Sequence, residues 1–205
     1  MLKIIGFCTL ILFFPLMLSG ECINGDCING RGAMLFENND YYTGYWKNGL
    51  FQGKGLMIYH NGDRYNGEWK EGVRHGKGEF FFTNGDVYKG NWRDGKPHGK
   101  GTMTYANGDR YAGEWAYGSY NGKGELTYAN GDRYVGEFKD GSYDGKGIMF
   151  FSYGNKYTGE WKKGKPNGKG TIYDPKGKIL YEGMWENGEP RPKTIKNEVR
   201  RELLR

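Results

Sequence analysis

The feature that most constrains this chain is a spacing of 23 residues that returns along most of its length. A Gly-x-Gly motif opens each unit, and a Tyr-x-Gly-x-aromatic motif closes it. A fixed period of this size, held for seven copies, is typical of an array in which each unit packs only on its neighbours. The opening glycines are Gly30, Gly53, Gly76, Gly99, Gly122, Gly145 and Gly168. We therefore expect one repeat array rather than a globular domain.

The composition suits a thin sheet better than a thick core. The chain has 37 glycines and 17 tyrosines among its 205 residues, and aliphatic residues are scarce after residue 18. Aromatic side chains must therefore supply most of the buried area. Of the formal net charge of +6, residues 191–205 carry +4 and residues 1–20 carry +1, so the array between them is nearly neutral. This distribution gives no support for a nucleic-acid surface.

Each unit contains a strong β-hairpin signal. In the second unit, residues 56–59 and 64–69 are alternating segments on either side of Asn61-Gly62. Asn-Gly favours a hairpin because both residues tolerate a positive φ. We therefore predict an all-β fold, an elongated single-layer antiparallel sheet of seven successive β-hairpins. These hairpins would supply about fourteen strands, followed by a short C-terminal helix.

Strand alternation separates the side chains of each unit onto two faces. Tyr65 and Trp69 point to one face with Gly67 between them, whereas Arg64 and Glu68 point to the other. One face of the sheet is then aromatic and, with no covering layer in the sequence, open. We predict that this aromatic face binds a protein partner or a second copy of the chain. Its residues are Tyr65, Trp69, Tyr88, Trp92, Tyr111, Trp115, Tyr134, Phe138, Tyr157 and Trp161.

The two ends of the chain differ from the repeats. Residues 1–20 have the layout of a secretory signal peptide, with Lys3 near the start, an apolar run and small residues at the end. A retained membrane anchor is the alternative. Residues 191–205 predict a basic amphipathic helix, with apolar residues at intervals of four. We expect this helix to cap the array at residues 30–190, and contact with a membrane surface is the alternative.

Residues 21–29 form an N-terminal cap that contains two cysteines. In an exported chain, Cys22 and Cys27 predict a local disulfide, whereas free thiols would indicate a reducing compartment. Lipidation at Cys22 is disfavoured because Glu21 separates it from the preceding small residue. We therefore expect a protein of the periplasm, the cell envelope or the exterior.

The Tyr-x-Gly-x-Trp and Gly-x-Gly motifs, with Asn-Gly-Asp between them, resemble the MORN (membrane occupation and recognition nexus) repeat. The resemblance covers about residues 27–189, and with its signal peptide the chain is similar to stand-alone exported MORN proteins of bacteria. It implies a scaffold, a dimerisation element or a protein-binding module, and some members are linked to acidic phospholipids. Where a MORN protein is catalytic, the activity belongs to a fused domain, and the sequence contains none.

No set of side chains in the repeats points to catalysis, a metal or a cofactor. His75 and His98 occupy a turn position that other repeats fill with Asn, Gln or Asp. Equivalent residues of neighbouring repeats lie about 10 Å apart, too far for two histidines to share a metal. A row of carboxylates on the open polar face favours ion pairing with arginines rather than acid–base work. These residues are Glu68, Glu114, Glu137 and Glu160, beside Arg64, Arg110 and Arg133.

We therefore predict a non-catalytic scaffold or protein-interaction module that binds through its aromatic face. The alternative is peripheral binding to acidic phospholipids through the basic tail and the lysines of the Gly-Lys-Gly motifs. The candidate lipid contacts are Lys54, Lys77, Lys100, Lys123, Lys146, Arg200 and Arg201. Carbohydrate binding is a third possibility, because exposed aromatic rings beside polar groups suit sugar rings.

Overall fold

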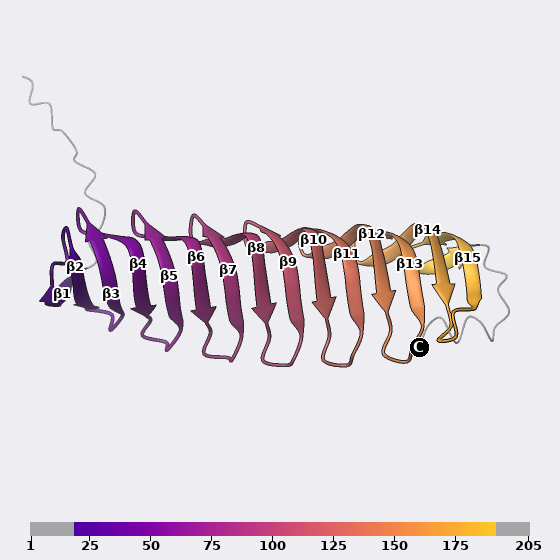
Figure 1. Ribbon diagram of the computed structural model, residues 1–205, viewed down its shortest axis with the longest axis horizontal. Coiled ribbons are helices and arrows are strands. Elements are labelled where there is room, and N and C mark those ends of the chain that lie inside the picture. The colour runs from indigo at the N-terminus through magenta and orange to yellow at the C-terminus, as the bar shows by residue number, and fades with distance from the viewer. Residues whose placement is uncertain (1–18, 192–205) are drawn as a thin grey trace, which may run out of the picture.

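A computed structural model describes residues 19–191 of the chain. These residues form a sheet of sixteen strands, in which each strand pairs antiparallel with the next one in the sequence. Figure 1 shows the strands side by side in one elongated layer, ordered from the N-terminus to the C-terminus. The predicted all-β sheet of successive hairpins is confirmed.

The sheet has one strand more at each end than the fourteen expected. The strands are β1 (Gly20–Gly25), β2 (Arg31–Phe36), β3 (Tyr41–Lys47), β4 (Leu50–Ile58), β5 (Arg64–Lys70), β6 (Val73–Phe81), β7 (Val87–Arg93), β8 (Lys96–Thr104), β9 (Arg110–Ala116), β10 (Ser119–Thr127), β11 (Arg133–Lys139), β12 (Ser142–Phe150), β13 (Lys156–Lys162), β14 (Lys165–Tyr173), β15 (Ile179–Glu186) and β16 (Glu189–Arg191). The predicted C-terminal helix lies outside the described residues, apart from the residue that ends β16, and so does all but the end of the predicted signal peptide. Within residues 19–191, no helix is long and apolar enough to cross a membrane.

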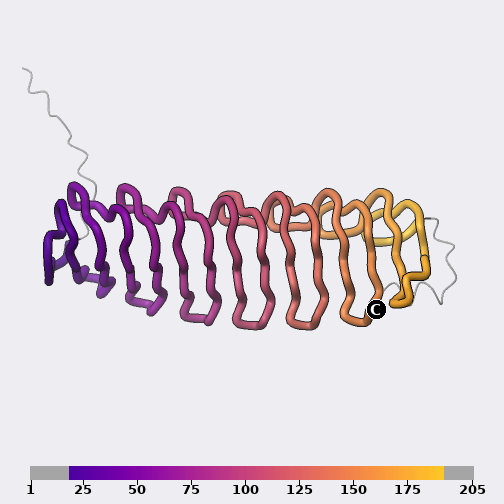
Figure 2. Tube along the Cα trace, in the orientation of Figure 1, coloured from indigo at the N-terminus to yellow at the C-terminus, as the bar shows by residue number. Residues whose placement is uncertain are grey.

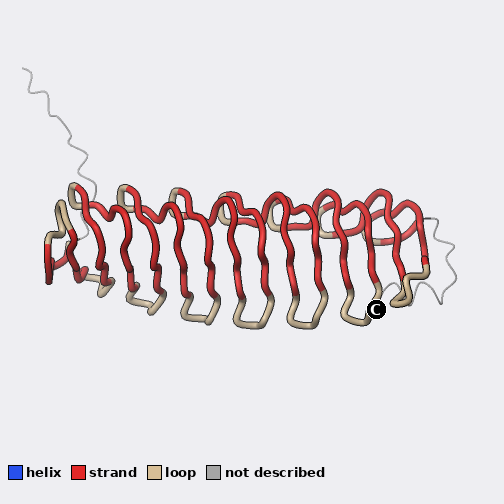
Figure 3. Tube along the Cα trace, viewed as in Figure 1, coloured by secondary structure: helices blue, strands red, loops and turns tan. Residues whose placement is uncertain are grey.

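Two kinds of turn alternate along the sheet. The wide turns, four of which contain the Asn-Gly-Asp motif, line the lower edge in Figure 3. In the turn after β4, the Tyr59 N–H donates to the Asp63 carbonyl, and the Gly62 N–H donates back to the Tyr59 carbonyl. The tight turns join one repeat to the next. Glu71 and Gly72 both have positive φ, 50° and 82°, which is the backbone of a type I′ hairpin turn.

A bulge bends every even-numbered strand from β4 to β14. Between β5 and β6, the register passes from the pair Gly67 and Gly78 to the pair Glu68 and His75, which leaves two residues of β6 out of the register. One of these residues is Gly76, whose φ of 62° is accessible to glycine at little cost. The segment before the bulge therefore folds back over the inner face of the sheet. Figure 2 shows the chain folding back along the upper edge.

The folded-back segment covers the tyrosine that recurs in each repeat, so that the tyrosine ring lies between this segment and the sheet. The Tyr111 ring stacks on Tyr120 from the folded-back segment, with ring centroids 3.7 Å apart and planes at 14°. On its other side, the Tyr111 ring covers the backbone of Gly113 and Gly124, which pair across β9 and β10. A Cβ atom at Gly113 would lie 2.5 Å from the Tyr111 hydroxyl oxygen and 2.6 Å from the Gly124 Cα. The row of paired glycines is therefore required by the tyrosines that lie on it.

The tyrosines and tryptophans form a continuous file of rings through the array. The edge of Tyr88 contacts Trp92 of its own repeat, at 5.1 Å between centroids, and Trp115 of the next repeat, at 5.0 Å. Both pairs are nearly perpendicular, an arrangement that aromatic rings favour. The Trp115 indole N–H donates to the Gly101 carbonyl over 3.1 Å. Each repeat therefore packs on the one before it through the same contacts.

Hydrogen bonds also join successive repeats at both edges of the sheet. At the lower edge, the Asp109 carboxylate accepts the Ala129 N–H of the next wide turn over 2.8 Å. In the equivalent hydrogen bond of another repeat, the Thr83 N–H donates to the Asp63 carboxylate, and this bond lowers the pKa of Asp63. At the upper edge, the Gly118 N–H of a tight turn donates to the carbonyl of the preceding repeat over 3.0 Å.

The N-terminal cap is an additional edge strand. β1 pairs antiparallel with β2, and all six of its residues are exposed. A disulfide joins Cys22 in β1 to Cys27 in the following turn, as the sequence predicts. Cys27 is buried with the first rings of the core. The disulfide therefore closes a short loop within the cap, at the end of the array where the file of rings begins.

Candidate interaction surface

The predicted open aromatic face is wrong, because the chain covers that face itself. Each of the ten candidate binding residues on it is between 0% and 7% exposed. The sandwich seen at Tyr111 returns at Tyr134, which stacks on Tyr143 with centroids 3.8 Å apart. Burial raises the pKa of these tyrosine hydroxyls far above their ordinary value. The aromatic residues are the core of the array, and a partner binding to the folded protein would not reach them. The buried candidates are Tyr65, Trp69, Tyr88, Trp92, Tyr111, Trp115, Tyr134, Phe138, Tyr157 and Trp161.

The opposite face of the sheet, which we call the outer face, is uncovered by any second layer within residues 19–191. Three rows of residues run along it, across the strands. The middle row is the backbone of the paired glycines, for example Gly101 with Gly113. One flanking row, the lysine row, contains the lysine of each Gly-Lys-Gly motif, as Lys100 opposite Glu114. The other flanking row is mixed in character, as Thr102 opposite the next strand's alanine.

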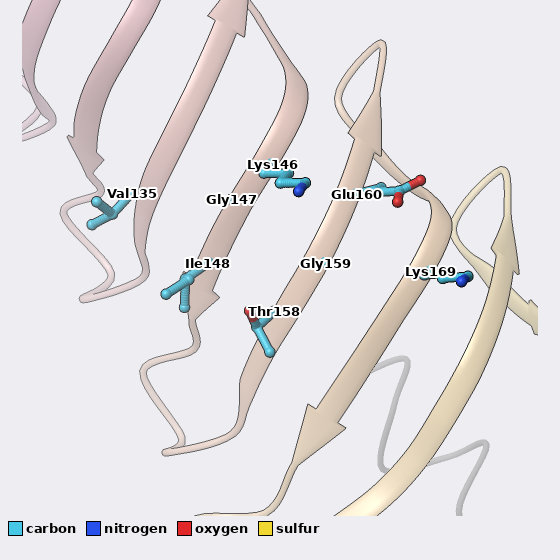
Figure 4. Close-up of a pocket in the computed structure, with 8 residues that line it drawn as sticks. All are labelled: Val135, Lys146, Gly147, Ile148, Thr158, Gly159, Glu160 and Lys169. Carbon is cyan, nitrogen blue, oxygen red and sulfur yellow. The ribbon is translucent and has the colours of Figure 1, made fainter.

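Between the two flanking rows lies a shallow depression floored by the glycines, which we call the outer trough. Figure 4 shows one stretch of it, with Lys146, Glu160 and Lys169 on one side and Ile148 and Thr158 on the other. No side chain rises from this floor, because the glycine positions face inward toward the tyrosines. The described residues form similar depressions in at least three places along the array, and the largest of these three, over β5 to β8, has a volume of about 560 Å³.

The lysine row is an exposed cationic feature of the outer face. The lysines predicted as lipid contacts lie on this one face, and all are exposed: Lys54, Lys77, Lys100, Lys123 and Lys146. Lys169 extends the row to β14, whereas Arg200 and Arg201 lie outside the described residues. Glutamates occupy the alternate positions, except at Asn91, between Lys77 and Lys100. The row therefore alternates in sign except over β6 to β8.

The predicted pairing of the carboxylate row with arginines is not what the structure shows. Arg133 instead pairs with Glu125 of the mixed row, at 3.2 Å, and Lys89 pairs with Glu79 there. The glutamates of the lysine row lean toward the bent edge, where Glu114 lies over the bulge glycine Gly122. Strand alternation cannot show this direction, because it depends on the space that the bulge glycine leaves.

The predicted turn position of His75 and His98 is wrong, because these residues lie inside strands β6 and β8, just before the bulge. In this position, the Gln52 side chain accepts the N–H of Glu71 from the next tight turn, and the Asp144 carboxylate accepts that of Lys163. His75 occupies the same position, and its Nδ1 is buried without a hydrogen-bond partner. Among the described residues, no group of three or more His, Cys, Asp or Glu side chains could hold a metal ion.

These features define a class of protein, a repeat array of β-hairpins with an internal aromatic core and one uncovered face. The model of the MORN repeat matches residues 42–64, 65–87, 88–110, 111–133, 134–156, 157–179 and 181–190. The chain belongs to the MORN repeat family. The comparison with curated proteins found no match.

The comparison with solved structures found matches at low sequence identity. One is the TCP domain of SAS-4 (dCPAP) in complex with a proline-rich motif of Ana2 (dSTIL) of Drosophila melanogaster. It is 12% identical, the match covers 90% of this chain and 99% of that chain, and the TM-score is 0.51. Another is the TCP10 domain of Danio rerio CPAP, which is 15% identical over 76% of this chain and 68% of that chain, with a TM-score of 0.33. The likeness to the first structure extends to the fold alone.

Proposed function

We propose that this protein is a non-catalytic interaction module that binds a protein partner across its outer face. The observation that carries the proposal is the outer trough, which runs beside the exposed lysine row over successive repeats. The chain's own folded-back segments cover the aromatic face, so the outer face is the broad surface that remains accessible to a partner. The membership in the MORN repeat family supports this role, and the fold neighbour from Drosophila was solved with a peptide motif bound.

The experiment is a selection of linear peptides from a display library on the full chain, followed by binding to two matched variants. The first variant carries Lys77→Glu and Lys100→Glu in the lysine row. The control carries Lys139→Glu and Lys162→Glu, which make the same change of charge at exposed strand ends near the bent edge. We expect the selected peptides to lose at least tenfold in affinity for the first variant and to bind the control almost unchanged.

Two results would contradict this proposal. One is a set of selected peptides that binds both variants as well as the natural chain. The other is a failed selection together with salt-sensitive binding of vesicles that contain an anionic phospholipid, which would favour the lipid role. Vesicles of neutral and of anionic composition are therefore included beside the peptides.

We also propose export to an oxidising compartment, on the basis of the predicted signal peptide and the disulfide of the cap. Mass spectrometry of the protein isolated from its native cells tests this proposal. We expect a mature N-terminus close to residue 21 and cysteines that resist alkylation until they are reduced. Intact residues 1–20 with freely alkylated cysteines would contradict it.

A further inference from the structure

The lysine row has a regular spacing that any bound ligand must match. Each repeat contributes two strands, and neighbouring strands lie about 4.8 Å apart, so successive lysines recur about every 9.6 Å along the array. Lys77, Lys100 and Lys123 show this arrangement, since each is the second residue to pair with the strand that follows it. A ligand lying in the outer trough meets one lysine at each interval. Its own charged side chains must return to the same side over the same distance.

The three regular backbone conformations differ in whether they can do this. An α-helix needs about 6.4 residues to advance 9.6 Å, which is not a whole number of turns, so its side chains drift around the axis. A β-strand advances about 10 Å in three residues, but its third side chain points to the opposite face. A polyproline II helix has three residues per turn and advances about 9.3 Å, and its third side chain returns to the same side. Only the last conformation keeps step with the lysines.

We infer that the outer trough binds an acidic peptide in the polyproline II conformation, which runs across the strands with one carboxylate at every third residue. This inference rests on the proposed function, because it names the partner chemistry of the same surface. The mismatch between ligand and row is about 0.3 Å per repeat, and therefore about 1.5 Å over five intervals, which flexible lysine side chains absorb.

The shape of the outer trough suits this ligand as well. Its floor consists of glycine backbone whose polar groups already pair within the sheet, as Gly78 does with Gly90. A ligand crossing the strands cannot add itself to that ladder, and a polyproline II backbone needs no such bonds because it remains solvated. The trough is shallow, so the carbonyl groups of the ligand stay in water. The ligand is also extended before it binds, which reduces the entropy lost on binding.

The charge pattern places the strongest anchor over β6 to β8. At this point Asn91 lies between Lys77 and Lys100, whereas Glu114 lies between Lys100 and Lys123 in the next repeat. A carboxylate of the ligand meets two lysines without an intervening acid only at the first of these positions. The depression of about 560 Å³, which Lys77, Asn91 and Lys100 help to line, lies here too. Binding should therefore be most sensitive to changes at this repeat.

Three peptides with five glutamates each test the spacing. Their glutamates are separated by one, two or three prolines, so the number of charges is equal while the period differs, and the length with it. Binding to the full chain is measured by fluorescence anisotropy at fixed ionic strength. We expect the peptide with two prolines to bind at least tenfold more tightly than the other two. Equal affinities for the three peptides, or no binding of the two-proline peptide, would overturn the inference.

Two single variants provide an independent test with effects of opposite sign. Asn91→Glu adds a carboxylate between two lysines, and we expect it to weaken binding of the two-proline peptide severalfold. Glu114→Asn removes one, and we expect it to strengthen binding by a similar factor. Both positions are on the surface, and circular dichroism checks that the fold is retained. Shifts in the same direction, or no shift in either variant, would contradict the inference.

These outcomes separate the inference from the proposed function. Library peptides that depend on Lys77 and Lys100 but bind no better when acidic residues recur at every third position would remove the inference and leave the interaction module standing. If no peptide, from the library or from the designed set, binds the outer face, both the inference and the proposed function are wrong. Anionic vesicles that bind as tightly as the two-proline peptide, and compete with it, would show that charge without spacing is recognised, and would overturn the inference.

Discussion

The wide turns of the central repeats and the last wide turn are joined to their neighbours by different means. In the centre, the Asp109 carboxylate accepts the Ala129 N–H of the next turn. At the last junction, the corresponding neighbour is Pro175, which has no N–H to donate. The residue opposite it is Asn155, which is neutral and buried. In this array an aspartate therefore occupies the turn position where the next repeat offers a backbone N–H, and a neutral asparagine occupies it where the next repeat has a proline.

The last turn also bonds within itself. Asp174 accepts the N–H groups of Lys176 and Lys178, at 2.9 and 2.8 Å. The file of rings ends beside it, because Tyr181 contacts Trp185 but has no following tryptophan. We therefore expect residues of the last repeat to contribute less to stability than their central equivalents, which have a neighbour on both sides.

The largest expected effect is the loss of a central tyrosine. Tyr111→Ala removes a fully buried ring that contacts rings of its own repeat and of the next, and we expect a loss of about 4 kcal/mol in the free energy of unfolding. Tyr181→Ala removes a half-buried ring with fewer partners, and we expect less than half of that loss. Chemical denaturation, followed by circular dichroism and tryptophan fluorescence, measures both. Equal losses would show that the array has no weaker end.

The glycine row gives a second contrast between the centre and the end. At Gly113, a Cβ would lie 2.6 Å from the Gly124 Cα and 2.7 Å from the Lys123 carbonyl oxygen, and backbone atoms cannot move aside. We expect Gly113→Ala to cost about 3 kcal/mol. At Gly183, the atoms closest to a Cβ belong to the half-buried Tyr181 side chain, so we expect about 1 kcal/mol. The same denaturation measurement decides, and a larger loss at Gly183 would contradict the packing argument.

The junction itself can be rewritten. We expect Asn155→Asp to cost about 1–3 kcal/mol, because it places a buried carboxylate opposite a proline that cannot donate. Adding Pro175→Ala restores an N–H at that position, as Ala129 provides one for Asp109. The double variant should therefore recover at least 1 kcal/mol relative to the sum of the single changes. Additive effects in this double-mutant cycle would mean that the carboxylate and the N–H do not interact.

The smallest expected effect is a dependence on acid. The pKa of Asp63 is lowered by the backbone N–H of Thr83, and the carboxyls of Asp40 and Asp132 are shifted in the same direction. A lowered pKa in the folded state adds stability above the ordinary pKa, and this contribution is lost as the pH falls through the folded value. We expect unfolding to become easier below about pH 4. Asp63→Asn should flatten this dependence slightly in denaturation curves between pH 2 and pH 6, and an unchanged slope would assign the effect to other groups.

The period, the hairpins and the two faces could all be predicted from sequence, because Gly-x-Gly, Asn-Gly and strand alternation are local signals. The bend could not. Its bulge leaves out Gly76 and Lys77, an even number of residues, so the alternation of Phe80 and Arg74 continues in phase on both sides. A sequence pattern of period two therefore gives no sign that the strand folds back. The prediction that the aromatic face is open failed for this reason.

Two features of the sequence carried information about the bend and the outer face. The first glycine of each Gly-x-Gly takes a positive φ, as Gly76 does, and a repeated glycine inside a strand is a known signal of a bulge. The positions of Phe51, Tyr120 and Tyr143 are in phase with the aromatic face, although each precedes the bulge. Strand alternation predicts both the lysine row and the inward direction of the glycines, whereas the depression beside the row is seen only in the structure.

The file of rings also determines how such a chain can change its length. Tyr88 contacts Trp115 of the next repeat just as Tyr65 contacts Trp92, at 5.0 and 5.2 Å. Deleting a whole unit of 23 residues would therefore bring together a tyrosine and a tryptophan that already fit, whereas deleting half a unit would leave both without partners. Genetic duplication or loss of complete units can lengthen or shorten this protein without any new interface having to arise.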